Sequence, residues 1–363
     1  MRIAQIASPI ESVPPKKYGG IERVIHALTE ELVRQGHDVT LFATGDSITS
    51  AKLVAPYPRN LRQDLQGEFF KKAQISLYHI ALAYQQQQQF DIMHDHTQWF
   101  GVPFAQHAIT PVVMTLHGAL TQETIALYET LSKPYLVSIS YAQTRPAPGL
   151  NYIANVYNGL DMTLYPFSPR HKGYLLFVGR ICQEKGVHHA IAVAEKLGLP
   201  LLIAAKLERD KKEHLAYFNR YVKPKLSPTI RWIGEVTEMQ RNKLFANALC
   251  SLHPVTWPEP FGLTLIEAMS CGCPVIAFDE GSIPEIIQHG RTGFIVHTVD
   301  EMITAVQHIT TIDRLYCRVY ATTTFHAKRM ADEYEGVYEA ILRSKQFVKR
   351  QRMTKNLNHF LSP

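Results

Sequence analysis

Short apolar segments alternate with amphipathic segments along almost the whole chain of 363 residues. Segments 2–7 and 111–117 are rich in apolar β-formers, which predicts strands, whereas apolar residues recur at helical spacing across 21–33. Strands that are buried on both faces have such continuous apolar runs, and their alternation with helices is typical of a parallel sheet covered on both sides. The pattern therefore predicts the α/β class.

A Pro- and Gly-containing segment, 165–173, interrupts this alternation near the middle of the chain. Strand and helix patterns begin again at 174–179, and a chain of this length has room for two domains of about 150 residues each. We expect two doubly wound domains, 1–168 and 169–325. Ligands of such sheets bind at the carboxyl ends of the strands, so the loops that follow the strands are where we expect the chemistry.

The formal net charge of +6 is confined to the C-terminal end. Residues 341–363 contain six basic residues and no acidic one, and the remaining Lys and Arg equal the 32 Asp and Glu in number. A protein that binds nucleic acid through its fold needs a basic surface on that fold, so no nucleic-acid partner is expected. The tail 346–363 is interpreted as a solvated extension or as a weak anchor to anionic lipid, since each basic residue near such a surface contributes about 1 kcal/mol.

The sequence contains no apolar run approaching the ~18 residues of a membrane span. Residues 1–10 lead directly into a strand pattern and lack the long apolar stretch of a signal peptide. The five cysteines, an odd number, suggest reduced thiols. We expect a cytoplasmic protein, with peripheral contact at the inner face of the membrane through the tail as an option.

Several catalytic motifs are absent. The sequence has no Gly-x-Gly, no P-loop, no Gly-x-Ser-x-Gly and no Asp-x-Asp pair for a metal on a sugar nucleotide. His94 and His96 follow a buried strand but have no third ligand, and Cys271 and Cys273 have no second pair at zinc-like spacing. We expect one packed histidine, one histidine facing a cleft, and no metal.

The densest group of candidate site residues lies between Glu259 and Glu267. Phe261 and Gly262 mark a turn into an apolar-periodic helix that begins near Leu263. A glycine at a helix start lets a ligand approach the backbone, and the unpaired amides of the first turn form an anion site. The flanking carboxylates can accept hydrogen bonds from sugar and ribose hydroxyls.

A second loop provides two cations. Arg180 and Lys185 lie between the strand 174–179 and a following helix. The guanidinium fork and the ammonium point charge together can neutralise a diphosphate.

These motifs, in this order, make the chain resemble a family 4 glycosyltransferase of the retaining, metal-independent kind with the GT-B architecture, in which two Rossmann-like domains with parallel sheets face a central cleft. The resemblance spans nearly the whole chain. The matching residues are Tyr18-Gly19-Gly20-Ile21-Glu22, Asp91 with His94 and His96, Thr115 to Gly118, Asn158 to Asp161, Gly179-Arg180 with Lys185-Gly186, and the pair Glu259 and Glu267.

The resemblance implies transfer of a hexose from a nucleotide sugar, with retention at the anomeric carbon and without a cofactor. The first domain would take the acceptor and the second the donor, and a helix over 326–345 would cross back to the first domain. The catalytic residues implied are His117, Arg180, Lys185 and Glu259. Donor contacts are implied at a larger set, in which Glu267 holds the ribose and Trp232 and Gly234 lie near the base: Gly19, Gly20, Trp232, Gly234, Phe261, Gly262, Leu263 and Glu267.

One segment departs from the family pattern and leaves alternatives open. Family members often have Gly-x-Gly after the strand 201–205, where this chain has residues 204–208 with the sequence AAKLE. The donor is expected to be UDP-glucose or GDP-mannose and the acceptor a sugar, a lipid-linked molecule or a small molecule. The competing interpretations are a GT-B nucleotide-sugar epimerase and a non-catalytic protein that binds nucleotide sugars.

Overall fold

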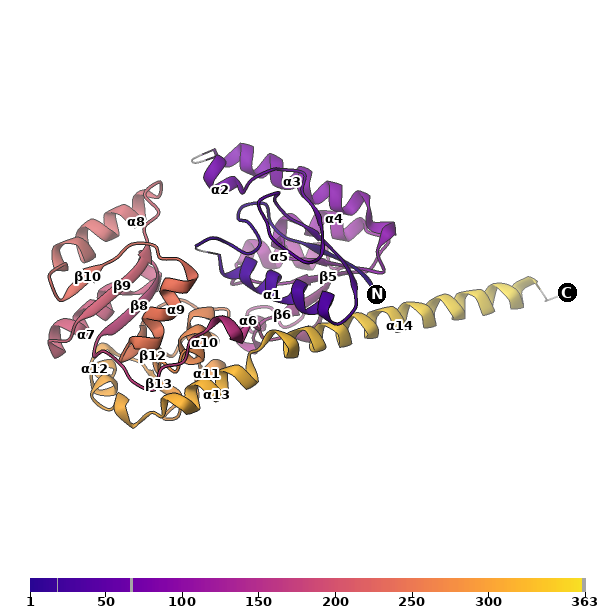
Figure 1. Ribbon diagram of the computed structural model, residues 1–363. Helices are drawn as coiled ribbons and strands as arrows, with labels where there is room; N and C mark the ends of the chain where they lie inside the picture. The colour runs from indigo at the N-terminus through magenta and orange to yellow at the C-terminus, as the bar shows by residue number, and fades with distance from the viewer. Residues whose placement is uncertain (18, 66–67, 361–363) are drawn as a thin grey trace.

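The computed structural model describes the backbone of residues 1–17, 19–65 and 68–360, and side chains as far as Ser344. Figure 1 shows two α/β halves, each built on its own parallel sheet, with the C-terminal helix running from the second half along the first. The two sheets confirm the predicted class, and every pairing between neighbouring strands is parallel.

The first sheet has seven strands in the order β3-β2-β1-β4-β5-β6-β7. Its strands are β1 (Arg2–Ile6), β2 (Asp38–Phe42), β3 (Lys52–Val54), β4 (Ile92–Asp95), β5 (Val112–Thr115), β6 (Tyr135–Ser138) and β7 (Tyr152–Asn155). The helices of this half are α1 (Gly20–Arg34), α2 (Leu61–Asp64), α3 (Phe69–Gln85), α4 (Val102–His107), α5 (Gln122–Thr130) and α6 (Tyr141–Thr144).

The second sheet has six strands in the order β10-β9-β8-β11-β12-β13. Its strands are β8 (Leu175–Arg180), β9 (Leu201–Lys206), β10 (Ile230–Trp232), β11 (Cys250–His253), β12 (Val275–Phe278) and β13 (Gly293–Val296). The helices are α7 (Val187–Leu197), α8 (Lys212–Tyr217), α9 (Glu238–Asn247), α10 (Leu263–Ser270), α11 (Ile283–Ile286), α12 (Val299–Gln307), α13 (Arg314–Thr324) and α14 (Ala327–Phe360).

Strand order reverses between β1 and β4 in the first sheet and between β8 and β11 in the second. At such a reversal the connections leave in opposite directions, which opens a crevice at the carboxyl ends of the two central strands. The loops that follow β1, β4, β8 and β11 therefore border the two crevices.

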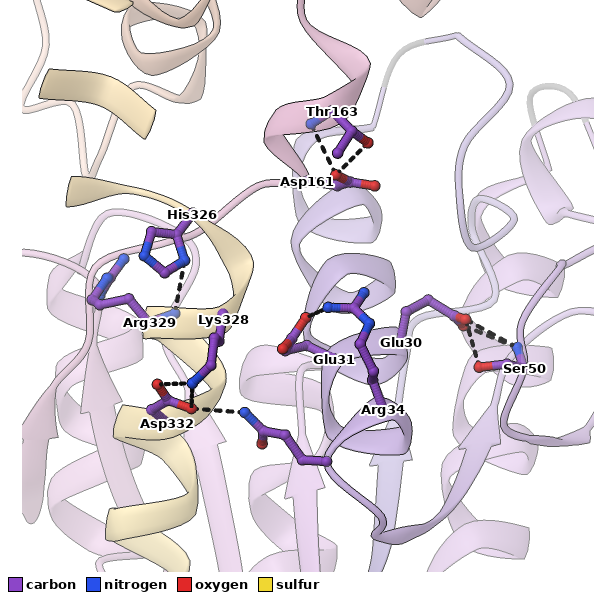
Figure 2. A network of polar contacts seen from close by, with 11 residues as sticks. Glu30, Glu31, Arg34, Ser50, Asp161, Thr163, His326, Lys328, Arg329 and Asp332 are labelled. Atoms are coloured by element: carbon purple, nitrogen blue, oxygen red, sulfur yellow. Dashed lines mark hydrogen bonds and ion pairs between the residues drawn. The ribbon is translucent and has the colours of Figure 1, made fainter. Parts of the chain in front are cut away.

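Helix α14 joins the end of the chain to the first domain. It packs an apolar face, including Met330, Tyr334 and Tyr338, against residues of the first sheet and α1. Polar contacts flank this face: Gln35 Nε2 donates to Asp332 Oδ1 at 2.7 Å, and Arg329 donates to the backbone carbonyl of residue 157 at 2.8 Å. Figure 2 shows that Asp332 is also bound by Lys328 of the same helix, whose Nζ lies 2.7 Å from Oδ2. The helix continues past residue 345 to Phe360.

None of the helices in the described part of the chain combines the length and apolarity that crossing a bilayer requires. The five cysteines are buried and unpaired with one another. One lies in β11, two in the turn after α10, one in the loop after β8 and one in α13, where they serve as small packing residues.

Candidate active site

A cleft of about 510 Å³ lies where the two domains face each other. It brings together all the predicted site residues except Glu267, Trp232 and Gly234: Gly19, Gly20, His117, Arg180, Lys185, Glu259, Phe261, Gly262 and Leu263. These residues are far apart in sequence and come from loops that follow strands and from the starts of α1 and α10. Tyr18, which belongs to the matching glycine-rich loop, lies outside the described residues.

Lys185 and Glu259 form an ion pair in the cleft wall, and both side chains are mostly buried. Trp257 Nε1 donates to Glu259 Oε2 at 3.0 Å, and the indole ring also faces the ammonium, with Lys185 Nζ 4.8 Å from the ring centroid. Burial acts to raise the pKa of Glu259, but the Lys185 charge and these hydrogen bonds outweigh it, so the pKa lies below its ordinary value. Glu259 is therefore a carboxylate, ready to accept hydrogen bonds from hydroxyl groups.

The start of α10 presents backbone amides to the same cleft. Gly262 caps the helix in the left-handed region, with φ of +76°, and no side chain caps the first turn. A Cβ at Gly262 would lie 2.8 Å from Leu265 Cδ1, so the glycine is required both by its backbone angle and by space. The first-turn amides and the helix dipole form an anion site at this position.

The start of α1 approaches the start of α10 across the cleft. Gly19 caps α1 without a side-chain hydrogen bond, and a Cβ at Gly20 would lie 3.0 Å from Leu263 Cδ1 of the other domain. Two helix N-termini, one from each domain, therefore converge on the same region. Their combined partial positive charge favours an anionic ligand between them.

Arg180 ends β8 at the edge of the cleft. Its guanidinium lies 3.7 Å from Glu208 and 3.9 Å from Glu184. Glu208 belongs to the segment that replaces the family's Gly-x-Gly. Lys206 is in the same segment, and its Nζ lies 3.7 Å from Glu208 Oε1. The departure from the family pattern thus brings a carboxylate to the predicted diphosphate-binding arginine.

Neutral histidines line the first-domain wall. His117 follows β5, and its Nε2 lies 2.9 Å from Nδ1 of His96, which follows β4. Burial lowers the pKa of His117 to about 3, so the ring is uncharged at neutral pH. His94 lies behind His96, with the two ring centroids 4.0 Å apart, which matches the expectation of one packed histidine and one at the cleft.

Glu267 lies beside the main cleft in a smaller cavity of about 60 Å³. The carboxylate is fully buried and is held by two arginines, with Arg241 Nη2 at 3.0 Å and Arg23 Nη2 at 3.2 Å. Arg23 comes from α1 of the first domain, so this ion pair joins the two domains. The sequence pattern does not identify Arg23, because an arginine on an amphipathic helix ordinarily faces solvent.

Trp232 and Gly234 are not among the residues that line the main cleft. The Trp232 ring packs against Phe218 with centroids 4.7 Å apart, and its Nε1 donates to the backbone carbonyl of Ala205 at 2.8 Å. This is the geometry of a packed side chain with its one donor satisfied. The contact of Trp232 and Gly234 with a nucleotide base stays a prediction.

The described residues include one cluster with the composition of a metal site. Ligand atoms of Cys182, Glu184 and His214 lie within 4.8 Å of one another. Arg180 lies 3.9 Å from Glu184, and the positive charge opposes a metal cation there. Burial and the neighbouring carboxylate also raise the pKa of the Cys182 thiol to about 12.

Two further residues around Glu259 do not follow from the sequence motifs. Trp257 precedes Glu259 by two positions, and this closeness to the motif is the signal that could have pointed to it. His253, at the end of β11, places Nε2 3.9 Å from Glu259 Oε2, and burial lowers the pKa of His253 to about 4. In the sequence, a site histidine at the end of an apolar strand looks the same as a histidine that only packs in the core.

Two families of known proteins match the chain, one in each half. Residues 166–314 match the family described as glycosyl transferases group 1, and residues 18–154 match glycosyltransferase family 4. The glycogen synthase of Mycobacterium tuberculosis is 26% identical over 333 residues, which cover 77% of this chain and 79% of that protein.

Solved structures share the fold over the whole length. AviGT4, a glycosyltransferase involved in avilamycin A biosynthesis, superposes with a TM-score of 0.71 at 22% identity over 94% of this chain and 98% of its own. HepE of Anabaena, solved in complex with UDP and glucose, has a TM-score of 0.71 at 20% identity over 94% and 100% of the two chains. Together with the two family matches, these likenesses lead to one conclusion. The chain belongs to the family 4 glycosyltransferases and is an enzyme of the GT-B fold.

Proposed function

We propose that the enzyme transfers a hexose from a nucleotide sugar, with retention of anomeric configuration and without a metal. The observation that carries the proposal is the convergence of Lys185, Arg180 and the first turn of α10 on one cleft, opposite His117. The two cations and the helix start are suited to a diphosphate leaving group, and the uncharged imidazole is suited to a sugar hydroxyl.

The developing charge on the departing diphosphate would be stabilised by Arg180, Lys185 and the amides around Gly262. Such groups are positioned before the reaction and act where water is excluded, and in many enzymes their electrostatic stabilisation contributes most of the rate enhancement. Here it would replace the divalent ion that other transferases use.

Glu259 would hold hydroxyls of the transferred sugar. Its ion pair with Lys185 keeps the carboxylate charged, and the hydrogen bond from Trp257 fixes its direction. We do not assign it as a nucleophile. In the proposed front-face reaction, the acceptor hydroxyl attacks the anomeric carbon on the side that the diphosphate leaves, and a donor phosphate oxygen takes the hydroxyl proton.

Glu267 would hold the ribose hydroxyls of the donor. Arg23 and Arg241 both bind this carboxylate in the structure. Ribose can bind in one of two ways. Glu267 keeps both arginines and accepts the ribose hydroxyls with its remaining lone pairs, or it releases Arg23 as the donor enters. Either way, the contact between the domains at Glu267 is linked to donor binding.

UDP-glucose is the first donor to test and GDP-mannose the second. The Anabaena protein was solved with UDP and glucose, which supports a uridine donor for a chain of the same fold. A carbohydrate acceptor is supported by the glycogen synthase relative. Lipid-linked and small-molecule acceptors remain within the proposal, and the first-domain wall would select among them.

The donor assignment is tested by incubating the enzyme with each nucleotide sugar and an acceptor panel, then measuring products by mass spectrometry with and without EDTA. NMR of the product reports the anomeric configuration. Isomerised donor without acceptor would instead indicate an epimerase, and donor binding without turnover across the panel would indicate a binding protein.

Contact of the basic tail with a membrane surface is a separate prediction. The side chains of 346–363 lie outside the described residues. Co-sedimentation with anionic and with zwitterionic vesicles would test it, comparing the native chain with a variant whose tail Lys and Arg are replaced by Gln. Equal binding of both proteins to anionic vesicles would contradict the anchor.

A further inference from the structure

A buried chain of hydrogen bonds runs from the cleft into the first domain. His117 Nε2 lies 2.9 Å from His96 Nδ1, and His96 Nε2 lies 2.7 Å from Oε1 of Gln5, which is on β1. Gln5 is fully buried and His96 nearly so. A glutamine in a central strand of a parallel sheet is costly unless its amide is paired, so its position calls for a specific role.

The chain continues from Gln5 to helix α14. Gln5 Nε2 lies 3.4 Å from both His94 Nδ1 and the Tyr338 hydroxyl, and these two partners are 2.7 Å from each other. His94 Nε2 lies 2.7 Å from Thr115 Oγ1, which is 2.7 Å from the Tyr334 hydroxyl. Two tyrosines of α14 therefore terminate a network that begins at the cleft.

The histidines of this network are uncharged. Burial lowers the pKa of His94 and His96 well below the ordinary value, and that of His117 to about 3. A neutral imidazole has one N–H and one lone pair, so its hydrogen bonds have a direction. Two hydrogen-bonded neutral imidazoles must pair an N–H of one ring with the lone pair of the other.

The direction is set at Gln5. Its Oε1 can only accept, so His96 must carry its proton on Nε2 and present a lone pair at Nδ1. His117 must then donate through Nε2, which leaves Nδ1 as its lone pair. On the other side of Gln5, the amide nitrogen donates to Tyr338, whose hydroxyl can donate to His94 Nδ1.

We propose that Gln5, acting through His96, is a positioning residue that holds His117 in the Nε2–H tautomer. His117 lines the cleft, and His96 occupies its Nε2, so Nδ1 is the ring nitrogen left for a ligand. In this tautomer Nδ1 accepts a hydrogen bond from a hydroxyl. In the other tautomer it would be a donor, and a hydroxyl would have to turn its lone pair toward it.

The consequence for catalysis rests on the proposed function, whereas the tautomer does not. A sugar hydroxyl that donates to His117 Nδ1 becomes a better acceptor at its own oxygen. His117 thus recognises the hydroxyl through an uncharged ring. Helix α14 takes part because Tyr338 pairs with the amide group of Gln5 whose orientation decides the tautomer.

The test is NMR of the full-length protein labelled with ¹⁵N in its histidine rings, without ligand. Two-bond couplings separate a protonated ring nitrogen from an unprotonated one, and His117→Asn identifies the His117 signals. We expect protonated Nε2 and unprotonated Nδ1. A protonated Nδ1 in the wild-type protein, which would follow if the Gln5 amide were turned over, would overturn the proposal.

Gln5→Met removes the acceptor and should let both tautomers of His117 appear. Gln5→Leu is a second apolar replacement should the first not fold. Gln143→Met is the matched control, because buried Gln143 donates to the carbonyls of Leu116 and Gly118 on either side of His117 but does not touch the ring. A single Nε2–H tautomer in the folded Gln5 variants would refute the role of Gln5.

Activity provides the second arm. When His117 no longer keeps a single tautomer, its Nδ1 accepts the hydrogen bond of the substrate hydroxyl less reliably. We therefore expect kcat/KM of Gln5→Met to be about tenfold lower than that of the wild-type enzyme, with the donor and acceptor that the wild-type enzyme uses. If the wild-type protein transfers no sugar, the proposed function fails while the tautomer result stands. If transfer occurs and the tautomer is reversed, only the role of Gln5 fails.

Discussion

The two walls of the cleft use opposite chemistry. The second-domain wall carries charge: Lys185 and Glu259 are paired, and Arg180 lies near Glu208. On the first-domain side, His117 and His96 are uncharged rings joined to buried Gln5, and we call this part of the cleft the uncharged wall. Charged residues such as Arg62 line the cleft elsewhere on that side. A charged wall suits a leaving diphosphate, and an uncharged hydrogen-bonding wall suits hydroxyls. In the proposed function, charge stabilisation and hydroxyl recognition are therefore divided between the domains.

Removing the cation of the charged wall should have the largest effect. We expect Lys185→Ala to lower kcat by roughly 10²–10³, the cost of losing one preorganised group that stabilises transition-state charge. Steady-state kinetics with the active donor measures this. Lys225→Ala is the matched control, because Lys225 forms an exposed ion pair with Glu195. If kcat falls equally in both variants, the loss does not come from the position of Lys185 in the cleft.

The helix start on the same wall should come next. Gly262→Ala forces φ of +76° on a residue with a Cβ and moves the amides, so we expect kcat/KM to fall roughly 10²-fold. The left-handed angle alone costs about 1–2 kcal/mol of stability. Gly198→Ala incurs that cost at φ of +64° with open space around the Cβ, and should keep full activity. Urea unfolding and kinetics on both variants separate the two effects.

The uncharged wall should also affect the pH dependence of stability. The folded pKa of His117 is about 3, below the ~6.5 of an unfolded histidine, so the unfolded chain binds more protons between these values. The free energy of unfolding should therefore be highest above pH 6.5 and fall as the pH drops toward 4. His117→Asn should make this fall shallower, as measured by urea unfolding at several pH values. An unchanged slope would mean that the imidazole is not held neutral.

Metal removal should have the smallest effect. Because Lys185, Arg180 and the helix start supply positive charge, we expect activity after EDTA treatment to stay within about twofold of the untreated enzyme. Measurement with added Mg²⁺ after chelation completes the comparison. If activity is lost on chelation and recovers with Mg²⁺, a metal ion rather than the charged wall stabilises the leaving diphosphate.

Much of the charged wall was predictable because its parts are local in sequence. Arg180 and Lys185 share one loop, and Glu259 and Gly262 share one turn, so short motifs carry them. Trp232 shows the limit of this approach. An aromatic residue at a strand end is compatible both with packing and with a base contact. The structure shows that the ring packs on Phe218 and donates to the Ala205 carbonyl, and the base contact stays a prediction.

The uncharged wall was harder to predict because its parts meet only after folding. Gln5, His96 and Tyr338 come from β1, the end of β4 and α14, and no spacing in the sequence connects them. Arg23 is similar, since its partner Glu267 belongs to the other domain. Long-range pairs of buried polar groups leave no periodic signal, because each member looks like an ordinary residue of its own element.

The order of apolar segments by itself determined the two parallel sheets, and the local motifs determined the family and the cationic loop. Backbone hydrogen bonding and burial act on neighbouring residues, so the sequence carries them directly. Only the tertiary structure decided which histidine nitrogens face each other and that arginines of both domains bind Glu267. Those properties depend on the direction of hydrogen bonds between distant elements, and that direction exists only once the sheets, α1 and α14 have packed together.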